Sequence, residues 1–198
     1  MPRYAYPPDL RDRLIVAAAD RLAAGGPQGL SLRELAASQG TSTNAVYTIF
    51  GGKPELIAAV VTAARDGFVA AQQEALADGD SLQTLGELGR AYRRWALANP
   101  SLYRVMFAGD PYVDPGRPRL EGLVPLRGAL TRLIDAGLVR EVDVTLAARS
   151  LWAWVHGWVM LEIADGATPD PDSDAAFDGH LRASLVGIAS DALRATLA

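Results

Sequence analysis

Two short helices in immediate succession, each with its own cap, constrain this chain more than any other feature. Ser31-Leu32-Arg33-Glu34 is a capping box, in which the serine hydroxyl and the glutamate carboxylate each accept from the other residue's backbone N–H. It predicts a helix over 32–39. Gly40-Thr41-Ser42 then forms a tight connection whose last residue caps a second helix over 43–50. With a preceding helix over 9–24, the segment predicts three helices packed together.

This helix pair has two interpretations. The major groove of DNA admits a helix, and the second helix of such a pair lies there in three-helix DNA-binding units. Its outward residues are short polar or aromatic groups, namely Thr43, Asn44, Tyr47 and Thr48. The apolar positions that would fix the angle between the helices are Leu32, Leu35, Ala36, Ala45, Val46 and Ile49. The alternative is a capped helical hairpin inside a bundle, and the spacing alone favours neither.

The remainder of the chain is predicted to be helical, because β-branched alternation never persists for more than a few residues. Apolar residues at helical spacing predict further helices over 53–77, 81–98, 101–108, 119–136, 142–164 and 174–197. Pro- and Gly-containing stretches predict loops over 109–118 and 166–174 and a turn over 78–80. The expected fold is therefore all-α, with a helix-turn-helix domain over 8–68 and a helical bundle over 81–198.

Composition argues against an enzyme. The chain has two histidines and no cysteine, so disulfides, thiolate metal sites and thiol nucleophiles are excluded. His180 is expected on a solvated helix surface. Asp170, Asp172, Asp174 and Asp178 resemble calcium spacing, but they lack the central glycine and the terminal glutamate, so we interpret them as a solvated loop. No catalytic group, cofactor or metal is expected.

Charge and hydropathy restrict the location and the partners. Residues 1–53 hold six basic and four acidic side chains, a net charge of +2, while the other 13 basic and 19 acidic residues give −6. A mildly basic N-terminal segment followed by an acidic remainder is typical of a DNA-binding protein with a separate effector domain. The alternative is a chance charge imbalance in a short segment. No long uncharged apolar stretch and no leader-like N-terminus occur, so a cytoplasmic protein without a membrane span is expected.

From residue 11 to 61 the sequence resembles the N-terminal domain of the tetracycline-repressor (TetR) family. The segments that carry the resemblance are 14–18, 29–36, 40–47, Phe50 and 53–57. The resemblance implies that Ser31 and Arg33 touch phosphate, and that Tyr47 contacts the DNA backbone. It also implies that Ser42, Thr43 and Asn44 sit at the groove with Thr48 beside them. Lys53 would add a phosphate contact at the N-terminus of its helix.

Three features depart from the family pattern or extend it. Gly52 replaces the usual polar cap before Lys53, and Pro54 follows, so this helix start is expected to be positioned a little differently. The reading helix has no arginine, so strong guanine contacts are not predicted. Arg3, Tyr4 and Tyr6 form an extension that could reach a minor groove, but we favour a disordered tail.

The C-terminal half resembles one subgroup of the family, through residues 92–107 and the Trp-x-x-x-His-Gly signature at 152–157. It contains aromatic residues that could line an apolar cavity with one polar group, and these are Tyr92, Trp95, Tyr103, Phe107, Trp152, His156 and Trp158. The alternative, favoured for any single residue, is a filled aromatic core. Gly157 inside a helix indicates close backbone packing or pocket space.

The predicted last helix has an apolar side formed by Leu181, Leu185, Ile188, Ala192 and Leu193. Two helix pairs related by a two-fold axis would form a four-helix bundle, and packing within one chain is the alternative. The resemblance implies a homodimeric, sequence-specific transcriptional regulator. It would be a repressor, released from a palindromic operator when a hydrophobic small molecule binds the C-terminal domain; activation is the alternative mode.

Overall fold

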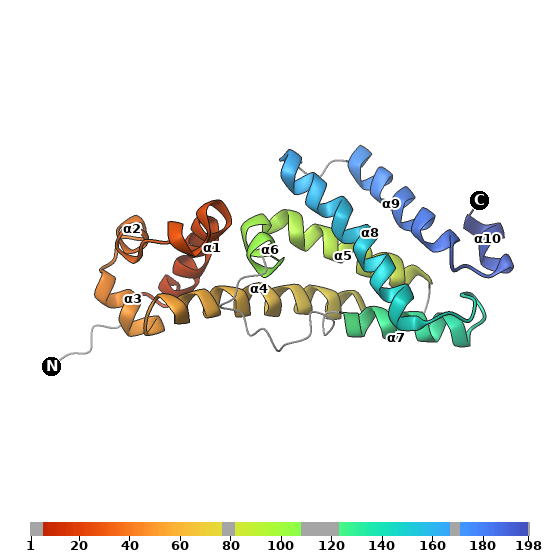
Figure 1. The fold of residues 1–198 in the computed structure, drawn as a ribbon, viewed down its shortest axis with the longest axis horizontal. Coiled ribbons are helices and arrows are strands. Elements are labelled where there is room, and N and C mark those ends of the chain that lie inside the picture. Colours follow the sequence, from red (N-terminus) through yellow and green to blue (C-terminus); the bar gives the residue numbers. More distant parts are fainter. Residues whose placement is uncertain (1–5, 77–81, 108–122, 167–170, 198) are drawn as a thin grey trace. The chain divides into compact units, whose positions relative to one another are not determined.

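The computed structural model describes residues 6–76, 82–107, 123–166 and 171–197 (Figure 1). Within these ranges the chain forms helices and no β-strand, with one isolated bridge between Val139 and Ala189. The predicted all-α class is confirmed. The contacts divide the chain into two compact units, one of residues 1–67 and 99–117, the other of residues 68–98 and 118–198. The predicted loop over 109–118, the turn over 78–80, and Arg3, Tyr4 and Asp170 lie outside the described residues.

The first unit is built around one apolar core. It contains helices α1 (Leu10–Gly29), α2 (Leu32–Ser38), α3 (Thr43–Phe50), α6 (Pro100–Phe107) and the first part of α4 (Lys53–Leu76). Leu14, Leu35 and Val46 are fully buried there, and Val105 of α6 joins the same core. α6 therefore groups with α1, although it lies in the range that the sequence assigns to a second domain. Tyr6 packs on this core rather than extending from it.

α1 breaks at the glycine pair, close to the predicted stop at Ala24. The backbone is non-helical at Gly26, where φ is +61° and ψ is −167°. Only glycine adopts that conformation readily, and Pro27 then begins a further helical turn with its preset φ. The regular part of α1 therefore ends as predicted, and a short turn to Gly29 follows it.

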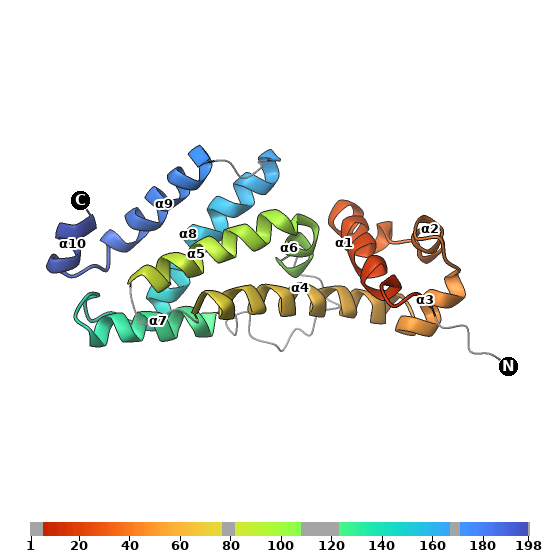
Figure 2. The same cartoon turned by 180° about the vertical axis from the view of Figure 1, so that it is seen from behind.

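The second unit contains the rest of α4 with α5 (Leu82–Ala98), α7 (Val124–Asp135), α8 (Val144–Asp165), α9 (Pro171–Val186) and α10 (Asp191–Leu197). Its core includes Leu88, Leu130, Leu133, Ala148 and Leu151. Figures 1 and 2 both show α8 and α9 side by side, as their contacts require.

The prediction of a single helix over 174–197 is wrong, because this segment forms two helices, α9 and α10. Arg140 N–H donates to the Ile188 carbonyl at 2.9 Å, and Ser190 N–H donates to the Leu138 carbonyl at 3.0 Å. These bonds occupy backbone groups that a continuous helix would need, so α9 ends and α10 begins after the bridge. No local sequence signal reveals a partner about 50 residues away.

The apolar side predicted as a subunit interface is largely buried within its own unit. Leu185 and Leu193 are buried, Ile188 packs against the core, and Leu181 lies against Gly89 of α5. That side of the last helices is therefore the inward side, and any surface for a second chain lies elsewhere on them.

Replacing Asp143 by alanine is expected to lower the free energy of unfolding by about 1 kcal/mol, because this residue is the N-cap of α8. Its Oδ1 accepts from Thr145 N–H at 2.9 Å and Leu146 N–H at 3.1 Å. The control is Asp135→Ala at the exposed end of α7, which should change stability by less than about 0.5 kcal/mol. Urea unfolding of both variants measures the difference, and equal losses would contradict the assigned cap.

Candidate functional site

The helix pair α2–α3 forms as its caps predict. Ser31 Oγ accepts from Glu34 N–H at 3.4 Å, and Ser42 Oγ accepts from Ala45 N–H at 3.2 Å. Gly40 has φ of +65°, in the left-handed region that glycine tolerates without a Cβ clash. These local choices hold α3 at a fixed angle to α2.

α3 is divided into an inward and an outward side. Ala45 and Val46 are fully buried, whereas Asn44, Tyr47 and Thr48 are exposed, with Tyr47 exposing 53 % of its surface. The Thr48 hydroxyl donates to the Asn44 carbonyl at 2.8 Å, so its proton is used within the helix. The outward side therefore presents an amide, a phenol, a methyl group and hydroxyl oxygens to solvent.

The other predicted DNA contacts flank α3. Arg33 and Ser42 are exposed, whereas Ser31, Thr43 and Lys53 are half-buried. All eight predicted residues thus lie in α2 and α3, at their caps, or at the first residue of α4. Their contact with DNA stays a prediction.

α4 begins directly after the unusual Gly52. Leu56 N–H donates to the Gly52 carbonyl at 3.0 Å, so the helix begins at Lys53 as predicted. Gly52 is buried, and a Cβ there would lie 2.8 Å from Glu55 Oε2. Glycine at this position leaves room for the Glu55 carboxylate beside the first turn.

Five aromatic side chains from α4, α5 and α8 meet in the second unit, and we name them the aromatic cluster: Phe68, Tyr92, Trp95, Trp152 and His156. The Phe68 ring contacts the rings of Tyr92 and Trp95 edge-on, with centroids 4.8 Å and 5.5 Å apart. The Trp152 and His156 rings stack at 5.0 Å, and the Tyr92 hydroxyl lies 3.0 Å from His156 Nδ1. The cluster is thus a largely apolar group that contains the Tyr92–His156 hydrogen bond.

Of the remaining residues predicted for this site, Trp158 contacts a different helix. Its ring lies near His180 and Phe177 of α9, with ring centroids 4.6 Å and 6.1 Å apart. Tyr103 and Phe107 are in α6, where their rings contact each other at 4.8 Å, and their part in ligand binding stays a prediction. Trp158 is four residues after Trp154 and therefore lies on the same side of α8 as Trp154. It is six residues after Trp152, so it lies on a different side from Trp152 and the cluster.

Phe68 is a member of the cluster that the sequence did not predict. Its only signal is that it is the sole aromatic residue in 53–76, among small and aliphatic neighbours. The ligand-binding role of the aromatic cluster stays a prediction.

Burial of the His156 imidazole lowers its pKa below the ordinary value of 6.5. The neutral ring is therefore the form that the fold favours. A neutral imidazole offers one donor and one acceptor, and the Tyr92 hydroxyl pairs with its Nδ1 atom.

We expect the protein to lose stability as the pH falls below about 6.5, the unfolded value for histidine, until the native imidazole itself is protonated. The lowered pKa means that the unfolded chain binds this proton more readily, so acid favours unfolding. His156→Asn can retain a bond to Tyr92 without titrating, and its stability should fall less between pH 7 and 5. Equal pH dependence in urea unfolding of the two proteins would contradict the assignment.

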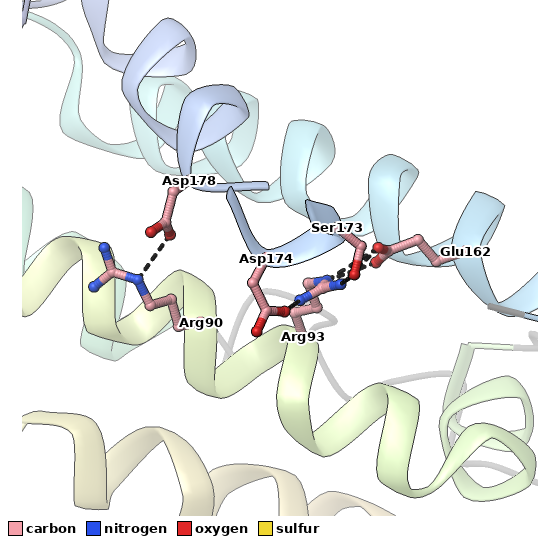
Figure 3. A network of polar contacts seen from close by, with 6 residues as sticks. All are labelled: Arg90, Arg93, Glu162, Ser173, Asp174 and Asp178. Carbon is pink, nitrogen blue, oxygen red and sulfur yellow. Dashed lines mark hydrogen bonds and ion pairs between the residues drawn. The ribbon is translucent and has the colours of Figure 1, made fainter. Parts of the chain in front are cut away.

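A network of ion pairs and hydrogen bonds joins α5 to α8 and α9 (Figure 3). The Arg93 guanidinium donates to Glu162 at 2.8 Å, to Ser173 at 2.9 Å and to Asp174. Arg90 donates to Asp178 at 2.8 Å. The hydrogen bond with Glu162 is the main cause of a raised pKa at Arg93.

Two interpretations of the α9 segment are therefore wrong. Asp174 and Asp178 are ion-pair partners on a helix and not part of a solvated loop, because Pro171 starts α9 early. His180 is half-buried between Trp154 and Trp158 and is not simply solvated. Among the described residues, no group of three acidic, histidine or cysteine side chains could hold a metal ion, and no helix is long and apolar enough to cross a membrane.

Two family models match the chain. "Bacterial regulatory proteins, tetR family" matches residues 14–60, and "Tetracyclin repressor-like, C-terminal domain" matches residues 85–184. No curated protein matches the chain significantly. The Trp-x-x-x-His-Gly subgroup stays a prediction.

Solved structures share the fold over most of their length. A TetR family transcriptional regulator, PfmR from Thermus thermophilus, is 29 % identical, with a TM-score of 0.73, covering 86 % of this chain and 98 % of its own. A Clostridium perfringens putative fatty acid metabolism regulator is 17 % identical, with a TM-score of 0.76 and coverages of 90 % and 100 %. SmeT, the repressor of a Stenotrophomonas maltophilia multidrug efflux pump, is 22 % identical, with a TM-score of 0.66 and coverages of 92 % and 92 %.

The family matches cover the helix pair and all of the aromatic cluster except Phe68. Together with the capped α2–α3 pair and the all-helical second unit, they establish the class of protein. The chain belongs to the tetR family of transcriptional regulators, which are DNA-binding proteins and not enzymes.

Proposed function

We propose that this protein is a homodimeric repressor that reads a palindromic operator with α3 and releases it when a hydrophobic small molecule binds the second unit. The observation that carries the proposal is the outward side of α3, where Asn44, Tyr47 and Thr48 are exposed opposite the buried Ala45 and Val46. A helix fixed on its apolar side and polar on its free side fits a major groove.

The chemistry of each exposed group assigns its role. Asn44 suits adenine, whose N6 and N7 atoms match an amide. The Thr48 hydroxyl donates a hydrogen bond to the backbone carbonyl of Asn44. Its methyl group is then the part of the side chain that suits a thymine methyl. Ser42 and Thr43 complete the surface that faces the bases, while Ser31, Arg33, Tyr47 and Lys53 hold the DNA backbone.

A second copy of the chain is the partner that the outward sides of α8 and α9 fit. On α8, Ser150, Ala153, Gly157 and Ala164 are exposed along one side with Leu161, which exposes 66 % of its surface. A Cβ on Gly157 would meet no atom within 4 Å, and its φ is not in the left-handed region. Nothing within the described chain requires glycine there, whereas a closely packed partner helix would.

α9 repeats the pattern. Ala176 and Ala183 are exposed on the side away from its buried residues, with Gly179 between them and the exposed Val186 beyond. A Cβ on Gly179 would also meet no atom within 4 Å. Two copies of α8 and α9 around a two-fold axis would bury these sides in a four-helix bundle.

The aromatic cluster is the effector site in this proposal. A neutral His156 bonded to Tyr92 among apolar rings supplies one polar group in an apolar setting, which favours a hydrophobic ligand with one hydrogen-bonding group. Titration with the neutral fluorophore N-phenyl-1-naphthylamine tests the assignment, since Trp152→Ala should weaken its binding. Failure of the wild-type protein to bind any apolar probe would favour the filled-core alternative.

Two helical segments can transmit the effect of ligand binding at the aromatic cluster to the DNA-binding first unit. α4 contributes Phe68 to the aromatic cluster and its earlier residues to the first unit. α5 contributes Tyr92 and is followed at once by α6, whose Val105 packs in the core with α1. A ligand that displaces Phe68 or Tyr92 would therefore act on both segments, with a coupling free energy of about 1–3 kcal/mol. Action on chromosomal DNA would require a cytoplasmic location.

The experiment that tests this function is selection from a random pool of short duplexes by the purified, ligand-free protein. We expect a palindrome to be enriched, because two α3 helices related by a two-fold axis read the same half-site twice. No enrichment at low salt from a folded dimer would contradict the proposal and leave a small-molecule binding protein as the better account.

A further inference from the structure

α5 separates two sets of contacts around its circumference. Tyr92 and Trp95 belong to the aromatic cluster, whereas Gly89, Arg90 and Arg93 face α9. One helix thus contacts both the proposed effector site and the helix that the proposed dimer uses. Figure 3 shows Arg90 and Arg93 reaching from α5 toward Asp178 and Asp174 of α9.

Arg93 is a buried cation, with only 6 % of its side chain exposed. Its Nε and Nη2 atoms donate to Glu162 near the end of α8, while Nη1 donates to Asp174 and Nη2 to Ser173 in the first turns of α9. The guanidinium carbon also lies 5.2 Å from the centre of the Phe177 ring. A single side chain therefore ties the end of α8 to the beginning of α9.

Two further contacts extend this alignment along α9. Arg90 pairs with Asp178 at 2.8 Å, and Leu181 lies so close to Gly89 that an added Cβ would come within 2.7 Å of it. Successive turns of α9 are thus matched to successive positions of α5. These contacts fix both the rotation of α9 about its axis and its position along α5.

A buried ion pair is a poor source of stability, because desolvation offsets most of the attraction. Apolar residues of similar size would stabilise the packing as well or better. What the forked guanidinium adds is a defined geometry, since it requires its acceptors in one plane. The arrangement therefore specifies where α9 lies more than how tightly it packs.

We propose that Arg93, aided by Arg90, is a positioning residue for self-association, which holds α9 so that Ala176, Gly179 and Ala183 face outward to meet a second copy. The inference rests on the proposed dimer. Loss of these contacts loosens the first turns of α9 and weakens the dimer, while the aromatic cluster and the first unit keep their structure.

The test replaces Arg90 and Arg93 together by lysine, which keeps every charge and removes only the planar forks. We expect the dimer dissociation constant, measured by sedimentation, to rise about tenfold or more. Hydrogen exchange should become faster in α9 and stay unchanged in α1–α3 and α7. The matched control is Arg127→Lys with Arg132→Lys, two exposed arginines of α7 in the same unit, and it should behave like the wild type.

A second variant approaches the same contacts from α9. Asp174→Asn with Asp178→Asn leaves the Arg93–Glu162 pair in place, so the chain should still fold. It should weaken the dimer in the same direction as the lysine variant. Asp135→Asn with Glu141→Gln removes the same charge from exposed positions and is its control.

The outcomes separate this inference from the proposed function. A wild-type dimer whose dissociation constant is unchanged by both variants, or equally changed by the controls, would overturn the inference alone. A wild-type chain that remains monomeric at micromolar concentration would overturn the dimer itself, and the inference with it.

Discussion

Replacing Gly157 by leucine is expected to convert the proposed dimer into a monomer. The position lies in the middle of α8 on the outward side, where an added side chain meets no atom of its own chain. Leucine improves the helix propensity by about 0.8–1 kcal/mol, so the subunit itself should be at least as stable. The dimer dissociation constant should nevertheless rise about 100-fold or more, because the leucine would force apart two closely packed helices.

The control for this change is Gly128→Leu in α7. Gly128 is also a helical glycine, and a Cβ there would meet only the flexible end of Arg132, at 3.5 Å. It gains the same helix propensity in α7, which is not part of the proposed interface. Sedimentation of the two variants at equal concentrations compares them, and a Gly157→Leu protein that dimerises as well as the wild type would show that α8 is not the interface.

Replacing Asn44 by alanine is expected to cost about 1–3 kcal/mol of operator binding at each half-site, because an amide that reads a base edge is lost. The side chain is exposed on the outward side of α3 and makes no contribution to the buried core. The loss should depend on the base pair opposite Asn44. Affinities for operators changed at one position at a time identify that base pair.

Lys53→Ala should behave differently, since a phosphate contact carries no sequence information. Affinity should fall for every duplex, and the slope of log K against log salt should become shallower by about 0.9 for each subunit. Thr62→Ala, an exposed change farther along α4, is the control and should leave both quantities unchanged. A Lys53→Ala protein with an unchanged salt slope would remove this residue from the DNA surface.

The DNA-binding half could be predicted in detail because its signals are local. Ser31 and Ser42 cap helices within three residues of themselves, and Gly40 turns the chain by its own backbone freedom. The helix bounds that follow from these residues differ from the observed ones by one residue at most in α2 and α3. Capping and turn chemistry act over a few bonds, so a single sequence contains them.

The second unit could not be predicted to the same depth because its contacts join distant segments. Arg93 meets Glu162 and Asp174 more than 65 residues later, and Phe68 meets Tyr92 from another helix. Helical periodicity gives the sides of α8 on which Trp152 and Trp158 lie, but not which neighbours cover those sides. The bridge that splits the last helix has the same origin.

The measurement that tests the central claim most directly is the affinity of the wild-type protein for its selected duplex before and after about five base pairs are inserted between the two halves. Two α3 helices held in one dimer require half-sites about one helical turn apart, or a multiple of it. The insertion turns one half-site to the opposite side of the duplex, and the affinity should fall to that of the Gly157→Leu monomer. An affinity that survives the insertion would contradict a rigid dimer reading both half-sites with α3.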